Sequence, residues 1–199
     1  MPDAPNLNDD FLTELGDNYS RISFEPKERL MHSHGHTLQE IWALRYNKLG
    51  SYVDVVIYPR TQEHVEKIVT LANDYDVVII PYGGGTNVTN ALSVNGEEQR
   101  MVVSLDMTRM NKVLEINPEN FTARVQAGII GADLEKQLRA QGFVCGHEPD
   151  SVEFSSLGGW IATKASGMKK NKYGNIEDIV INFNLVTSVG TFKYIDDDF

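Results

Sequence analysis

The 199-residue chain is predicted to adopt an α+β fold with two lobes, a small parallel βαβ lobe and a larger mixed-sheet lobe with helices. Two near-continuous apolar runs, at residues 53–58 and 77–80, are typical of buried strands. Between them, apolar residues recur at helical spacing over residues 61–72, and strand, helix and strand in this order predict a unit with parallel strands. Residues 121–127 instead alternate apolar and polar side chains, which indicates a strand with one solvated face in the second lobe.

The remaining elements follow from shorter patterns. Residues 1–50 are predicted to form an N-terminal helical leader, and residues 51–199 the main domain. The leader is expected to begin with a disordered stretch at 1–8 and to hold helices at 11–15 and 38–49. For the main domain, the sequence further predicts a strand at 101–105, a hairpin over 114–127, a helix from Asp133, a buried helix over 154–165 and a last strand over 179–189.

Composition excludes some classes of function. The chain has 18 Lys and Arg against 28 Asp and Glu, a net charge of −10, and such an acidic chain is not expected to bind nucleic acid. No apolar run approaches the roughly 20 residues of a membrane span, and neither a secretory signal nor a C-terminal targeting tripeptide is visible. A single cysteine, Cys145, cannot form an internal disulfide, which fits a reducing compartment.

The strongest local signal is a glycine loop directly after the second apolar run. It consists of Pro81, Tyr82, Gly83, Gly84, Gly85, Thr86 and Asn87. Three successive glycines can adopt positive φ and carry no Cβ, so their N–H groups can converge on an anion such as a pyrophosphate. The spacing is neither a Rossmann nor a Walker pattern, and from the residues alone a plain flexible turn is an equal alternative. If the loop binds phosphate, a bulky residue at Gly84 should abolish binding and leave the fold largely intact.

Two later segments are dense in small and hydroxyl-bearing residues. The first holds Asp150, Ser151, Val152, Glu153, Phe154, Ser155 and Ser156, and the second holds Thr163, Lys164, Ala165 and Ser166. Hydroxyl groups and free helix N–H groups suit contacts with phosphate or with the edge of a flat ring. The simpler alternatives are that Ser155 or Ser156 caps a helix and that the second segment is an ordinary loop.

Several single residues are further candidates. His147 adjoins the first of these segments and is the best histidine for a catalytic role, with a structural hydrogen-bonding role as the alternative. The pattern of His32, His34 and His36 could bind a metal if it lay on a strand, but no metal site is predicted. Lys169 and Lys170 could meet a substrate phosphate, although a solvated surface pair is favoured. Trp42 and Trp160 are expected in the core or between the lobes.

Taken in order, these segments resemble the FAD-binding domain of the vanillyl-alcohol-oxidase type, the PCMH-type fold. Within it, the chain looks most like the alkylglycerone-phosphate synthase (alkyldihydroxyacetone-phosphate synthase) family of ether-lipid (plasmalogen) synthesis. The matching strings are residues 81–87, 147–160, 165–171 and 173–178, and the likeness runs from about 32 to 189. The glycine loop is shared by many such flavoproteins, whereas Gly-His-Glu-Pro-Asp-Ser and Ser-Gly-Met-Lys-Lys-Asn are particular to the synthases.

The resemblance implies FAD contacts at residues 81–87, 150–156 and 163–166. FAD is expected to be non-covalent, because the loop contains no histidine or cysteine. The implied reaction exchanges the acyl chain of acyl-dihydroxyacetone phosphate for a fatty alcohol without net redox change. The resemblance also implies a peroxisomal location and leaves room for peripheral membrane association and a homodimer.

Two other functions remain open. One is the FAD domain of a D-lactate or 2-hydroxyacid dehydrogenase, and the other is a non-catalytic FAD-binding fragment. The second is considered because the synthases carry a cap domain with the lipid tunnel and the main catalytic residues. No match to that domain is visible here, so the chain is expected to be truncated.

Overall fold

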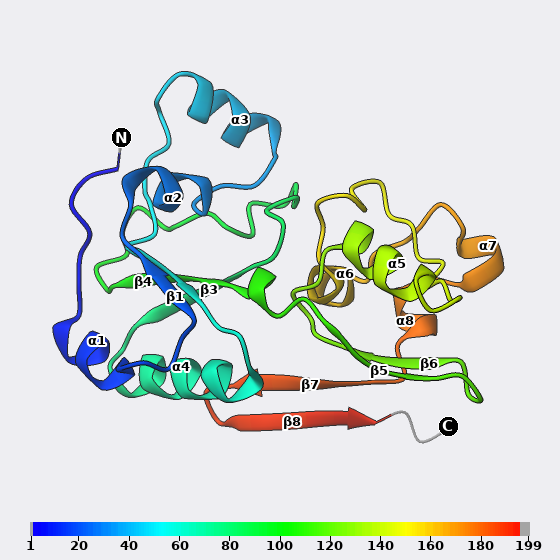
Figure 1. The fold of residues 1–199 in the computed structure, drawn as a ribbon. Helices are drawn as coiled ribbons and strands as arrows, with labels where there is room; N and C mark the ends of the chain where they lie inside the picture. Colours follow the sequence, from blue (N-terminus) through cyan, green and yellow to red (C-terminus); the bar gives the residue numbers. More distant parts are fainter. Residues whose placement is uncertain (1, 196–199) are drawn as a thin grey trace.

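The computed structural model describes residues 2–195 and shows two lobes side by side (Figure 1). The first lobe is built on a four-stranded sheet in the order β1-β2-β4-β3, from Arg21–Ser23, Val55–Tyr58, Val102–Asp106 and Val78–Tyr82. β2 and β3 each run parallel to β4, and β1 runs antiparallel to β2. Every residue of β2 and β4 is buried, as their continuous apolar runs predict.

Helix α4 (Gln62–Asp74) connects β2 to β3 and covers one face of this sheet. Thr61 caps its first turn by accepting a hydrogen bond from the backbone N–H of His64, and Val65, Ile68 and Leu71 are buried against the sheet. The predicted parallel βαβ unit is therefore confirmed. β4 lies between its two strands, so β2 and β3 are not direct neighbours.

The first fifty residues contribute four elements, α1 (Asp9–Leu15), β1, α2 (Pro26–Met31) and α3 (Leu38–Arg45). α1 lies beside α4 and buries Phe11 and Leu15 completely in the core that the two helices share. β1 joins the main sheet as an edge strand that the sequence did not predict. The prediction of a disordered start is wrong for residues 2–8, because Asn6 hydrogen-bonds to Asp54 and Gln99. α3 projects from the lobe (Figure 1), and its Trp42 is 50% exposed, so this tryptophan is not in the core, the first of the two places predicted for it.

The second lobe combines one hairpin with four helices. β5 (Val113–Asn117) and β6 (Thr122–Val125) pair antiparallel as predicted. The helices are α5 (Gly131–Arg139), α6 (Leu157–Thr163), α7 (Lys170–Tyr173) and α8 (Ile176–Ile179). Their core contains Ile129, Leu134, Leu138, Ile176 and the predicted core residue Trp160, which is 3% exposed.

A second hairpin ties the two lobes together. The final predicted strand, 179–189, is shorter than expected, because α8 extends to Ile179 and the strand β7 covers only Asn182–Thr187. An unpredicted strand, β8 (Gly190–Ile195), follows it and pairs with it. The hairpin runs back under α4 (Figure 1), where Asn184 bonds to Gln62 and Thr191 to Glu66. None of the helices in residues 2–195 combines the length and the apolar character that a membrane crossing would need.

Candidate cofactor site

The glycine loop begins at the carboxyl edge of the parallel strands. Tyr82 is the last residue of β3 and lies in register with Asp106, the last residue of β4. Burial, with a smaller contribution from the nearby Asp106 carboxylate, raises the pKa of Tyr82 to about 12, so its phenol keeps its proton. Gly85 is buried and has φ of +67°, and an added Cβ would lie 2.7 Å from the Tyr82 hydroxyl. The loop therefore turns back onto the side chain that precedes it.

The other two glycines are required for close packing, not for positive φ. An added Cβ on Gly84 would lie 1.7 Å from the Phe154 carbonyl oxygen, and one on Gly83 would lie 2.1 Å from Ser156 Oγ. Two of the three predicted cofactor segments, 81–87 and 150–156, are thus in direct contact across the two lobes. Gly84 is consequently a poor choice for a binding-only variant, and the expectation that a bulky residue there would leave the fold intact is wrong.

The 150–156 segment is held rigidly by the second lobe. The carbonyls of Val152 and Ser155 accept hydrogen bonds, both 3.0 Å long, from the backbone N–H groups of Ala132 and Gly131 at the start of α5. Ser156 caps α6 by accepting from the N–H of Gly159, as the simpler alternative predicted. The α5 N-terminus is therefore occupied by this segment and is not available to a phosphate.

Ser155 and Trp160 connect the glycine loop to His147. Ser155 Oγ accepts a 2.7 Å hydrogen bond from Trp160 Nε1, and the Trp160 ring lies 5.0 Å from the His147 ring between centroids. His147 is 1% exposed, and neither of its ring nitrogens has a hydrogen-bond partner among residues 2–195. Burial lowers the pKa of His147, although the Glu177 charge opposes the shift, so the imidazole is neutral near pH 7. A buried neutral imidazole with both nitrogens unpartnered can still take one donor and one acceptor.

The third predicted segment, 163–166, lies at the far end of α6. Its first residue, Thr163, is the last of the seven residues of α6 and follows Ser156 by seven positions, which corresponds to about 10 Å at the rise of an α-helix. Its Ser166 bonds to Asn175, and with Asp150 and Lys170 it lines a cavity of about 230 Å³. The structure thus brings 163–166 next to Asp150, at one end of the second segment, while the glycine loop contacts the other end.

The lysine pair has two different environments. Lys169 Nζ lies 2.9 Å from Glu148 Oε1 in an exposed ion pair, which matches the favoured surface role. Lys170 faces the cavity beside Asp150.

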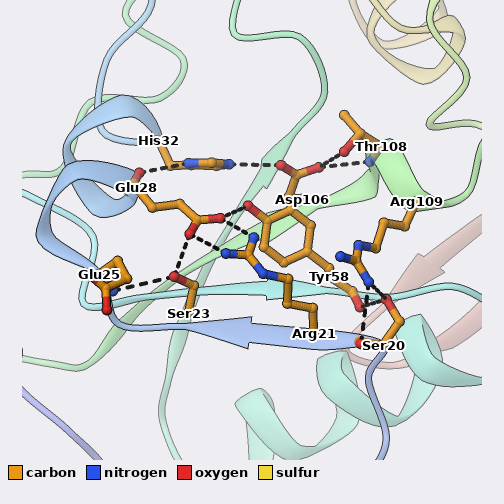
Figure 2. Close-up of polar contacts among 10 residues, drawn as sticks. All are labelled: Ser20, Arg21, Ser23, Glu25, Glu28, His32, Tyr58, Asp106, Thr108 and Arg109. Atoms are coloured by element: carbon orange, nitrogen blue, oxygen red, sulfur yellow. Dashed lines mark hydrogen bonds and ion pairs between the residues drawn. The ribbon is translucent and has the colours of Figure 1, made fainter.

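Sequence reasoning missed residues of the first lobe at the same edge. His32 bonds to Asp106 and its ring lies against the ring of Tyr82, and Gly35 packs on Asn87 (Figure 2 shows the His32–Asp106 contact). The His-x-His-x-His segment is not a strand, and no group of three potential metal ligands occurs in the part of the chain that the structure describes. The only sequence signal was the closely spaced histidines, which suggested a metal and not a contact with the loop.

A two-lobed α+β fold with a glycine loop between the lobes defines a class of flavin-binding domain. Residues 53–195 match the FAD binding domain family, and the chain belongs to that family. The PCMH-type fold and FAD as the cofactor are thereby confirmed. The residues present fit such a cofactor. The backbone at Gly85 has positive φ and carries no Cβ that would block a ligand, the Phe154 side chain beside the loop is 66% exposed, and both ring nitrogens of His147 lack partners in the described residues.

Known relatives narrow the class. The chain is 50% identical over 191 residues to an alkyldihydroxyacetonephosphate synthase of Caenorhabditis elegans, a match that covers 96% of this chain and 32% of that protein. It superposes on a solved alkyldihydroxyacetonephosphate synthase with a TM-score of 0.95 at 40% identity, covering 99% of this chain and 37% of the other. A mitochondrial D-lactate dehydrogenase (cytochrome) of Arabidopsis thaliana is 33% identical over 146 residues, which cover 73% of this chain and 24% of that protein. The predicted resemblance is confirmed, and the chain spans about a third of the length of the synthases it matches.

Proposed function

We propose that this chain is the FAD-holding part of an alkyldihydroxyacetonephosphate synthase, which exchanges the acyl chain of acyl-dihydroxyacetone phosphate for a fatty alcohol. The observation that carries the proposal is the packing of Gly83 and Gly84 on the 154–156 segment. That packing joins a loop common to flavoproteins with the segment that follows Gly-His-Glu-Pro-Asp-Ser, one of the strings particular to the synthases. The likeness to the synthases extends over nearly the whole chain, whereas the likeness to the dehydrogenase covers 73% of it.

The chain's own residues would hold the cofactor in three places. Backbone N–H groups of Gly83 to Asn87 would bind the pyrophosphate, and residues 150–156 and 163–166 would contact the rest of FAD. The bound flavin supplies the bond-making chemistry, while the protein supplies binding and orientation. The loop has no histidine or cysteine, so we infer non-covalent binding, which release of intact FAD on denaturation would test.

His147 is the one candidate catalytic residue in this chain. Its imidazole is neutral near pH 7, so it can accept or donate a proton within the buried wall beside Trp160. We propose that its unpartnered nitrogens face substrate or cofactor in the assembled enzyme. A purely structural histidine would instead have satisfied these nitrogens within the fold.

FAD titration tests the cofactor proposal directly. The purified chain should quench flavin fluorescence on binding FAD and acquire a protein-bound flavin absorbance spectrum. A folded chain that takes up no added FAD would exclude the proposed site. Binding that survives removal of free FAD by gel filtration, but not denaturation, would support the non-covalent arrangement.

Two activity assays separate the candidate functions. The chain and the full-length nematode relative, as positive control, are supplied with acyl-dihydroxyacetone phosphate and a labelled fatty alcohol. Label in an ether-linked product identifies a synthase, whereas reduction of an electron-accepting dye by D-lactate identifies a dehydrogenase. Bound FAD with neither activity would identify the chain as an FAD-binding module.

The cellular setting is also a proposal. From the likeness to the synthases, we infer a peroxisomal location, peripheral association with membranes and a homodimeric state. Fractionation of cells that express the chain, vesicle flotation and light scattering test these three properties independently.

A further inference from the structure

The segment from His32 to Glu40 runs from the end of α2 into the first turn of α3 and lies outside the range that matches the FAD binding domain family. We call it the brace. It contacts the glycine loop or the residues that flank it at three separate points, and none of the predicted cofactor contacts lies within it. The first two contacts restrain the two ends of the loop, and the third fixes the brace itself and ties it to the chain beyond the loop.

The first contact joins the middle of the brace to the end of the loop. An added Cβ on Gly35 would lie 2.6 Å from the Asn87 backbone oxygen and 2.7 Å from both polar side-chain atoms of Asn87. The neighbouring N–H of His36 donates a 2.7 Å hydrogen bond to the same Asn87 oxygen. Asn87 Oδ1 in turn accepts from the N–H of Ala91 at 3.0 Å. Since the φ of Gly35 is not in the left-handed region, glycine is needed there for space alone.

The second contact supports the start of the loop. The His32 ring lies 4.1 Å from the Tyr82 ring between centroids, at an interplanar angle of 39°. Its Nδ1 and Nε2 lie 2.8 Å from the Glu28 carbonyl oxygen and from Asp106 Oδ2 (Figure 2). Both ring nitrogens therefore face oxygen atoms, and this fixes the plane of the imidazole. Asp106 is itself held, because its other oxygen accepts from the N–H and the hydroxyl of Thr108.

The third contact closes the brace on itself and on the chain beyond the loop. Glu40 is 5% exposed, and its two oxygens accept from the N–H groups of Gly35 and Thr37 at 2.8 and 2.9 Å. The Ser93 hydroxyl also donates to Glu40, at 3.3 Å. A single buried carboxylate thus fixes the position of Gly35 against Asn87.

From these contacts we propose that residues 32–40 position the glycine loop for cofactor binding, with Gly35 and His32 as positioning residues. The inference rests on the proposed cofactor site, because it assigns the brace to the loop that would hold the pyrophosphate. Among the predicted FAD-binding residues, these contacts join the brace to Tyr82 and Asn87. Its effect on the cofactor is therefore indirect, through the shape of the loop.

The test compares Gly35→Ala with the matched control Gly50→Ala. A Cβ on Gly50 meets no atom within 4 Å, and its φ is also outside the left-handed region. Hydrogen exchange of the apo chain measures how well the backbone of residues 82–93 is protected, and FAD titration measures the affinity for the cofactor. We expect Gly35→Ala to speed exchange in 82–93 selectively and to weaken FAD binding about tenfold, as misplacement of a binding group by a fraction of an ångström does. Gly50→Ala should change neither.

Glu40→Gln provides a second variant without added bulk. An amide offers only one acceptor oxygen, so one of the two brace N–H groups loses its partner, and we expect the same selective exchange in 82–93. If both variants showed the same exchange rates and the same FAD affinity as Gly50→Ala, the proposed role of the brace would be overturned. Faster exchange spread evenly over the chain would also overturn it, because that result indicates general destabilisation. A wild-type chain that binds no FAD would defeat the proposed cofactor site, while the exchange comparison would still decide whether the brace holds the loop.

Discussion

Replacement of Gly84 by alanine should damage both the packing between the lobes and the cofactor site. The added Cβ would lie 1.7 Å from the Phe154 carbonyl oxygen, half of the 3.4 Å at which ordinary van der Waals contact begins. The obstructing atom is backbone, and its segment is fixed by hydrogen bonds to α5, so a side-chain rotation cannot relieve the overlap. We expect a loss of about 3 kcal/mol in the free energy of unfolding, at the upper end of overpacking costs. For a domain of this size that lowers Tm by about 6–12 °C.

Thermal unfolding with and without FAD measures both effects. In wild-type protein, saturating FAD should raise Tm, because the ligand binds only the folded state. Gly84→Ala should show the lower Tm and lose the FAD-dependent increase, whereas Gly50→Ala should unfold within about 0.5 kcal/mol of wild type. Equal stability of the two variants, with a normal response to FAD, would refute the assignment of Gly84 to a close contact between the lobes.

Three further substitutions probe the surroundings of the site. Because the pKa of His147 is lowered in the folded state, its neutral form favours the fold fully above about pH 6.5, and this contribution is lost as the pH falls below that value. His147→Leu should therefore make the free energy of unfolding, measured in urea, less sensitive to acid. It should not lower stability at pH 7, because the imidazole nitrogens have no hydrogen bonds to lose. Burial opposes the ionisation of Glu28, but hydrogen bonds from Arg21, Ser23 and Tyr58 outweigh it and lower its pKa to about 2, so its contribution is complete above about pH 4.5 and disappears toward pH 2; Glu28→Gln should flatten that part of the stability profile. Ser155→Ala leaves the buried Trp160 indole N–H without its acceptor and should cost about 1–3 kcal/mol, measured by urea unfolding.

The sequence predicted the elements with strong periodicity. The apolar runs of β2, β3 and β4 and the helical pattern of α4 are set by local burial, and the structure places them close to the predicted bounds. Short elements were missed, because β1 has only three residues and α2 six, too few for a period to show. Trp42 was misplaced for a related reason, since an aromatic side chain on a short helix gives no indication of which face is buried.

The predicted site segments were found through their composition. Composition indicates which chemical groups a segment can offer, but it does not show which residues the segment contacts. Small and hydroxyl-bearing residues identified 150–156, yet only the structure shows that Ser156 caps α6 and that Phe154 meets Gly84. The role of glycine at positions 83 and 84 also differs from the prediction. Positive φ can be inferred from a residue type, but a requirement for space depends on what another lobe places there.

The brace shows where sequence reasoning reaches its limit, because its contacts are set by strand order. Asp106 lies beside Tyr82 only because β4 is inserted between β2 and β3, and that order cannot be read from three similar apolar runs. Because Asp106 lies at that edge, the imidazole of His32, the residue that directly follows α2, can bond to it and also contact the Tyr82 ring. Gly35 then follows three residues later, close enough to reach Asn87 at the other end of the loop. A glycine loop that is loose by composition is thus held at both ends by a segment nearly fifty residues earlier in the chain, and a loop held in this way can bind its ligand with little loss of conformational entropy.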